Sequence, residues 1–190
     1  MRFFDSRGYW HVPGVRLLHA SLHVHLSALV AGALLLLAGS SQPSHALAIL
    51  GCYFGVILLH EMGHAAMARR LGYAAPRIWL SFLHGACEHD AAETQRDDAL
   101  IAWGGVLAQL AVAFPLLALA QLHAFDDSAL GRILVVGFGR ANLLLAAFNL
   151  LPIRPLDGAK AWPLLPILVR EWRARGVAKK AARDLMQRLK

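Results

Sequence analysis

Two histidines and a glutamate form the most distinctive group of reactive residues in this sequence. They lie in the stretch His60-Glu61-Met62-Gly63-His64. Residues four apart on a helix lie one turn apart on the same face, so both imidazoles can bind one Zn²⁺ ion while Glu61 faces the open coordination position. This spacing is typical of zinc hydrolases. We therefore predict that His60 and His64 bind one zinc ion and that Glu61 is the catalytic base.

A third zinc ligand is expected at the end of a later apolar segment, where two prolines should end a helix. The chain reads Leu150-Leu151-Pro152-Ile153-Arg154-Pro155-Leu156-Asp157-Gly158 there, and Asp157 is the only carboxylate between Asp127 and Glu171. An oxygen ligand from Asp157 would complete a three-residue site and leave the fourth position for water.

The composition indicates a membrane protein. Hydrophobic residues make up 57% of the chain and charged residues 16%, with a mean hydropathy of +0.49, whereas about a quarter of the residues in a soluble domain are charged. Four apolar segments approach the roughly 20 residues that cross a bilayer as a helix. They are residues 22–38, 46–68, 100–123 and 131–151. A signal peptide is the alternative interpretation of the first segment.

The distribution of Lys and Arg predicts the orientation of these spans. Basic residues precede the first span, separate the second from the third and follow the fourth, whereas residues 39–45 and 124–130 contain none. Cytoplasmic loops are enriched in basic residues. We therefore expect a multi-pass integral protein of a bacterial inner membrane, with both termini in the cytoplasm and His60 to His64 near the cytoplasmic end of the second span.

The basic end of the chain reads as an amphipathic helix. Val177, Ala181, Leu185 and Leu189 recur every four residues among Lys and Arg, which is typical of a helix lying on anionic lipid. Nucleic-acid binding is not expected, because basic residues beside a membrane follow from topology. The predicted fold is an all-α polytopic membrane protein, with a membrane-embedded core in residues 1–160 and a tail in residues 161–190.

Together, the two motifs resemble the site-two protease family of intramembrane zinc metalloproteases. The resemblance extends from Gly51 to Ala159 and rests on the stretches His60 to Ala65, Ala68 to Gly72, Asn149 to Pro152 and Pro155 to Gly158. It implies that His60, His64 and Asp157 bind zinc and that Glu61 is the base. It also implies transmembrane protein substrates, cut near the cytoplasmic face, often regulators whose release changes transcription. Arg154 and Ala159 depart from the proline and glycine usual in the family.

The resemblance also suggests how a substrate is bound. Asn149 matches an asparagine upstream of the aspartate motif and is expected to contact the substrate backbone; the alternative is a buried amide that ties helices together. Residues 77–83 predict a short strand, and the resemblance implies that it belongs to a small membrane-associated hairpin between the second and third spans. Its edge could bind unwound substrate by strand addition. An interfacial loop anchored by Trp79 is the alternative.

Other histidines and other functions remain open at this point. His19, His23 and His25 have no carboxylate or cysteine beside them and are expected at the membrane interface, while His84 and His89 either modulate the zinc site or are hydrated loop residues. A zinc transporter would need ligands along several spans, and the intact motifs argue against an inactive adaptor. The sequence gives no indication of oligomeric state.

Overall fold

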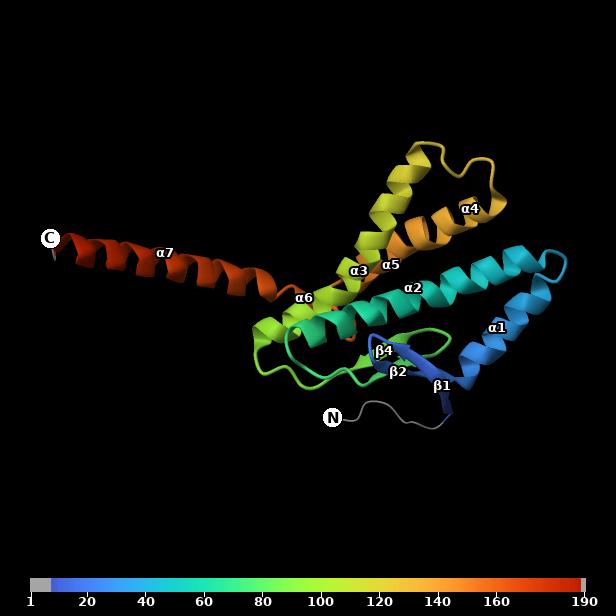
Figure 1. Cartoon of the computed structure of the whole chain (residues 1–190), viewed down its shortest axis with the longest axis horizontal. Coiled ribbons are helices and arrows are strands. Elements are labelled where there is room, and N and C mark those ends of the chain that lie inside the picture. Colours follow the sequence, from blue (N-terminus) through green and yellow to red (C-terminus); the bar gives the residue numbers. More distant parts are fainter. Residues whose placement is uncertain (1–7, 189–190) are drawn as a thin grey trace.

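In the computed structural model, residues 8–188 are described, and most of them are helical. The elements are β1 (Tyr9–Leu17), β2 (Ala20–His25), α1 (Leu26–Ala38), α2 (Pro43–Arg70), β3 (Arg77–Leu80), β4 (Gly85–Glu88), α3 (Gln95–Gln121), α4 (Ala129–Leu134), the π-helix η1 (Val135–Ala141), α5 (Asn142–Asn149), α6 (Gly158–Ala161) and α7 (Leu164–Arg188). The elements α4, η1 and α5 form one continuous helix, Ala129–Asn149. The sheet lies beside α2, and α7 extends away from the other helices (Figure 1).

Among the described residues, three helices are long and apolar enough to cross a membrane: α2, α3 and Ala129–Asn149. They correspond to the predicted second, third and fourth spans and make the chain an integral membrane protein. Local signals fix their ends. Pro43 occupies the first turn of α2, and Thr94 caps α3 by accepting a hydrogen bond from the backbone N–H of Asp97.

The predicted first span is not a continuous helix. Its first residues belong to strand β2, and α1 has only 13 residues, which rise about 20 Å against a hydrocarbon core of about 30 Å. Leu22 and Val24 alternate with His23 and His25, and this period of two is the signal of a strand. A hydropathy average does not register the alternation. Helix length therefore supports three spans and does not establish a fourth.

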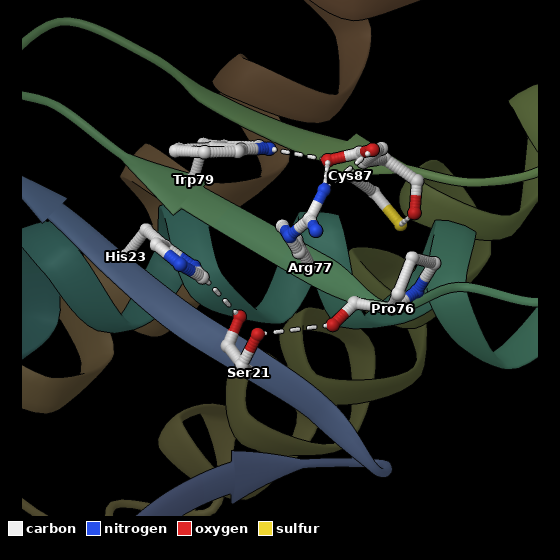
Figure 2. A network of polar contacts seen from close by, with 7 residues as sticks. Ser21, His23, Pro76, Arg77, Trp79 and Cys87 are labelled. Atoms are coloured by element: carbon white, nitrogen blue, oxygen red, sulfur yellow. Dashed lines mark hydrogen bonds and ion pairs between the residues drawn. The ribbon is translucent and has the colours of Figure 1, made fainter. Parts of the chain in front are cut away.

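The prediction of an all-α fold is also incomplete, because between residues 8 and 188 four strands form one sheet in the order β1-β2-β3-β4. The predicted hairpin between the second and third spans is present as the antiparallel pair β3–β4. The second hairpin, β1–β2, was not predicted, and β2 pairs parallel with β3. Ser21 joins the two hairpins by donating from Oγ and from its backbone N to Pro76 O, at 3.1 and 2.9 Å (Figure 2).

The two faces of the sheet differ. One face packs on the helices, where Leu22, Ile78 and Leu80 join a buried cluster with Ile57, Ala65, Ala68 and Ile101. The other face is polar, and there Arg77 and the indole N–H of Trp79 both donate to Glu88 (Figure 2). The apolar face thus holds the sheet against the half of α2 that carries the histidine motif.

The predicted amphipathic tail is a helix. Its start is tied to α3 by an ion pair between Arg96 and Glu171 at 3.3 Å. Beyond this pair Trp172 and Val177 are exposed. Leu189, the last residue of the predicted apolar repeat, lies outside the described residues.

Candidate metal centre

His60, His64 and Asp157 converge on one point. The two Nε2 atoms lie 3.0 Å apart, and Asp157 Oδ2 lies 2.9 Å from His60 Nε2 and 3.1 Å from His64 Nε2. Within residues 8–188 these three form the one group of at least three metal-ligating side chains. Helix α2 supplies the histidines, and the loop after α5 supplies the aspartate. The structure therefore brings together the three residues that the sequence suggested as zinc ligands.

Hydrogen bonds on the far side of each imidazole favour metal binding. His60 Nδ1 lies 2.9 Å from Gln109 Oε1, and His64 Nδ1 lies 2.7 Å from the carbonyl of Ile101. Both partners are acceptors, so each Nδ1 carries a proton and each neutral ring turns its Nε2 lone pair toward Asp157. Two lone pairs and a carboxylate aimed at one point need a cation, and this donor set fits zinc.

Asp157 itself favours a positive charge at this point. Burial opposes its ionisation, yet in the metal-free protein His60 and His64, once protonated on Nε2, would donate hydrogen bonds and supply positive charge that hold the pKa of this carboxyl below its ordinary range. A bound cation would supply the same positive charge.

Close contact between α2 and α3 makes room for this arrangement. A Cβ on Gly104 would lie 2.5 Å from the carbonyl oxygen of Gly63, so the two backbones touch. A Cβ on Gly105 would lie 2.6 Å from His64 Nε2. Any larger residue at either position would push α3 away from the imidazoles. Small residues that let helix backbones touch are typical of membrane interfaces.

A tightly folded loop carries Asp157 back to α2. A Cβ on Gly158 would lie 2.2 Å from the carbonyl oxygen of Leu150, so only glycine allows this approach. The indole N–H groups of Trp162 and Trp103 donate to the carbonyls of Leu150 and Ala161, at 2.7 and 3.0 Å. These bonds fasten the loop to the end of α5 and to α3, which fixes the aspartate.

Glu61 is buried next to the ligands, with 5% of its surface exposed. Strand β4 covers it: a Cβ on Gly85 would lie 2.7 Å from Glu61 Oε1, and the backbone N–H of Cys87 hydrogen-bonds the carboxylate. Burial, with the negative charges of Glu61 and Glu88, raises the pKa of the Cys87 thiol to about 12. The sheet edge and the predicted catalytic base are therefore neighbours.

The remaining candidate residues are not among the three that meet at this point. Asn149 is the last residue of α5 and is partly buried. His84 bonds Ser81 in the β3–β4 turn, and His89 lies on an exposed loop against the carbonyl of Asp90. His23 stacks on Trp79 with ring centroids 4.5 Å apart. The substrate role suggested for Asn149 stays a prediction.

Gln109 was missed by the sequence analysis. It is the only strongly polar residue between Ile101 and Ala120, and a lone amide in a membrane span usually has a partner. That signal was available. The carbonyl of Ile101 gave no such signal, because every residue has one.

Comparisons with known proteins show similarity to zinc metalloproteases. No protein-family model matches the chain. A zinc metalloprotease of Methanocaldococcus jannaschii is 30% identical over 107 residues, which are 56% of this chain and 31% of that protein. Stage IV sporulation protein FB of Bacillus subtilis is 33% identical over 147 residues, 76% of this chain and 47% of that protein. The chain thus spans less than half the length of each.

The solved structure of a site-2 protease from Methanocaldococcus jannaschii has the same fold. The two structures superpose with a TM-score of 0.65 at 22% sequence identity. The superposed region covers 86% of this chain and 73% of the site-2 protease chain. Fold and side-chain arrangement together describe a membrane protein in which two histidines and an aspartate form a candidate metal site. In sequence the chain is similar to named zinc metalloproteases, and in fold it is similar to a site-2 protease, so the comparisons support its resemblance to the site-two protease family.

Proposed function

We propose that this chain is an intramembrane zinc metalloendopeptidase that cuts transmembrane proteins near the cytoplasmic face. The observation that carries the proposal is the meeting of His60, His64 and Asp157 beside the buried Glu61. A buried acid in a membrane span is costly unless it has a function. Here it lies next to a site built for a cation.

The residues divide the chemistry between them. His60, His64 and Asp157 would hold one zinc ion, which would polarise the scissile carbonyl as a Lewis acid and lower the pKa of water toward neutrality. Glu61 accepts the proton of the attacking water at its carboxylate and passes it to the leaving amine nitrogen. The hydrogen bond from Cys87 N–H orients the Glu61 carboxylate.

Strand β4 offers a place for the unwound substrate. Peptide bonds in a helix are already hydrogen-bonded, so a transmembrane substrate must open locally before a carbonyl can react. β4 is at the edge of the sheet and borders Glu61 at Gly85. Substrate added beside β4 as a further strand would pass the catalytic base, and Asn149 is the candidate for a second backbone contact.

An apolar groove on the protein agrees with the proposal that the substrate is a transmembrane segment. It has a volume of about 910 Å³, lies between α2 and the helix Ala129–Asn149, and is lined by Ile49, Val56, Ile133, Val136 and Leu145 among others. Its lining also includes Leu83 of the β3–β4 turn and Ile57, one turn before Glu61. Apolar walls that end beside the base suit a membrane-spanning segment.

The proposed placement has four crossings with both termini in the cytoplasm of a bacterial cell. We infer that β2 and α1 cross together: α1 covers the outer part of the bilayer beside α2, and β2 continues toward the inner face inside the sheet. Exposed Leu29, Leu34 and Leu37 on α1 suit contact with lipid. The basic end of α2, at Arg69 and Arg70, would lie on the cytoplasmic side.

We further propose that residues 161–190 are an accessory tail on a core of residues 1–160. Helix α7 carries exposed Trp172, 75% accessible, beside a basic stretch. The basic residues are Arg173, Arg175, Lys179, Lys180 and Arg183. Aromatic and basic side chains together suit the surface of an anionic membrane.

Cleavage by the purified full-length chain in lipid nanodiscs tests the proposed activity. We expect a single-span substrate to be cut by the wild type, while Glu61→Gln lowers the rate by about 10² to 10⁴ and keeps its zinc. Glu93→Gln, in the loop before α3, is the matched control. Wild-type cleavage by Glu61→Gln would contradict the assigned base, and zinc transport into proteoliposomes that survives this substitution would indicate a transporter instead.

The proposed cellular role is regulated proteolysis of a membrane-anchored regulator. Gel mobility of candidate substrates in cells carrying the wild type or Glu61→Gln tests it. A shortened, soluble product that forms only with the wild type is expected. Identical patterns for every candidate would contradict the regulatory role while leaving the purified activity as a separate result.

A further inference from the structure

One face of α3 supports both imidazoles. Ile101, Gly105 and Gln109 are spaced four apart and therefore lie in a row along the helix. The Ile101 carbonyl accepts from His64 Nδ1, Gly105 leaves room for the rings, and Gln109 Oε1 accepts from His60 Nδ1 at 2.9 Å. The two hydrogen bonds differ in origin. A backbone carbonyl holds His64, whereas His60 depends on the identity of one side chain.

The orientation of the Gln109 amide decides which ring nitrogen of His60 can bind a metal. With Oε1 facing the ring, Nδ1 must carry the proton and Nε2 presents its lone pair to Asp157. With the amide turned over, its N–H would donate to Nδ1 and the proton would move to Nε2, which would block coordination. Gln109 is completely buried, so no water exchanges freely with this bond.

The fourth span contacts the backbone of Gln109. Asn142 Nδ2 donates to the backbone carbonyl of Gln109 at 3.0 Å and to that of Phe138 at 3.1 Å. Asn142 is completely buried and directly follows the π-helix η1. Single π-turns inside α-helices are common at functional sites. Here the π-turn is followed by an amide that ties the two helices together at the level of His60.

We propose that Gln109 is a positioning residue that sets the affinity of the site for zinc by fixing the orientation and tautomer of His60. This inference rests on the zinc site of the proposed function. A neutral amide orients the ring without adding a third carboxylate beside Glu61 and Asp157. Loss of such an outer hydrogen bond typically weakens metal binding by roughly 10- to 100-fold.

Zinc affinity of the full-length protein in nanodiscs, measured by competition with a chelator, tests the inference. We expect Gln109→Leu to bind zinc roughly 10- to 100-fold more weakly. Gln109→Glu keeps the acceptor and should bind zinc at least as tightly as the wild type. Gln121→Leu makes the same change at the exposed end of α3 and should have no effect. The melting temperatures of the zinc-free proteins show whether a substitution has damaged packing. A variant that melts like the wild type but binds zinc more weakly has lost only the positioning of His60.

The order of affinities decides the outcome. Wild-type affinity in Gln109→Leu, or equal losses in Gln109→Leu and Gln109→Glu, would overturn the inference. If Gln109→Leu does not fold, Gln109→Glu decides alone, and weaker binding than the wild type counts against the positioning role. A wild type that binds no zinc at His60, His64 and Asp157 would overturn the proposed function as well, whereas a zinc-loaded wild type with unaffected variants would overturn only this inference.

Discussion

The two halves of α2 are packed in different ways. The second half carries His60, Glu61 and His64, all buried, and its backbone touches α3 at Gly63. The first half exposes Leu47, 62% accessible, and lines the groove that faces the helix Ala129–Asn149. One helix therefore contributes both to a closely packed site and to an open apolar surface.

The difference matches two separate requirements. Metal ligands and a catalytic base must be held to within a fraction of an ångström, which close packing and outer hydrogen bonds achieve. A substrate segment needs a surface that it can reach from the lipid and leave again. Changes in the second half of α2 should therefore disturb zinc and chemistry, and changes along the groove should disturb only substrate binding.

The largest effect is expected where α2 touches α3. Gly104→Ala places a methyl group 2.5 Å from the carbonyl of Gly63, which should cost about 1 to 3 kcal/mol of stability. The resulting shift of the ligands should slow cleavage by up to about 100-fold. Gly51→Ala is the control in the first half of α2, because its Cβ would meet nothing within 4 Å. Thermal unfolding and cleavage assays should separate the two variants, and equal behaviour would remove the distinction between the halves.

A smaller effect is expected from filling the groove. Val136→Trp adds bulk to the groove wall and should slow cleavage of a transmembrane substrate by roughly tenfold without changing zinc content. Leu144→Trp is the control, because Leu144 is 73% exposed on the same continuous helix and is not among the residues that line the groove. Equal rates for both variants would mean that the substrate takes another path.

The smallest effect concerns the thiol beside the base. Because burial and nearby carboxylates raise the pKa of Cys87 to about 12, the thiol is protonated at neutral pH and should alkylate slowly, faster as the pH rises. Glu61→Gln removes one negative charge, which lowers this pKa and should accelerate alkylation a few-fold. A Cys52→Ala background and a Glu93→Gln control make the measurement specific. An unchanged rate would place Glu61 farther from β4.

The parts of this molecule that follow simple periods were predictable from the sequence. The spacing of His60 and His64 and the lone carboxylate Asp157 pointed to the ligand set, and three apolar runs predicted α2, α3 and the helix Ala129–Asn149. The short strand after Pro76 was recognisable from its Ile and Trp. Each of these signals is local.

What the sequence did not reveal depends on pairing at long range. Strand β2 pairs with β3 across the whole of α1 and α2, and its Leu22 and Val24 raised the hydropathy of the segment enough to suggest a span. The role of Gln109 appears only when α3 lies against α2. No local pattern fixes that contact, although Gly63, Gly104 and Gly105 make it sterically feasible.

X-ray absorption at the zinc edge, on the purified wild type and on Asp157→Ala, tests the central claim most directly. We predict one zinc ion per chain in the wild type, with two imidazole nitrogens and one carboxylate oxygen at about 2.0 to 2.2 Å. Asp157→Ala should lose most of its zinc or lose the carboxylate from the spectrum. Zinc bound with the same stoichiometry and the same ligands in both proteins would contradict the site described for this chain.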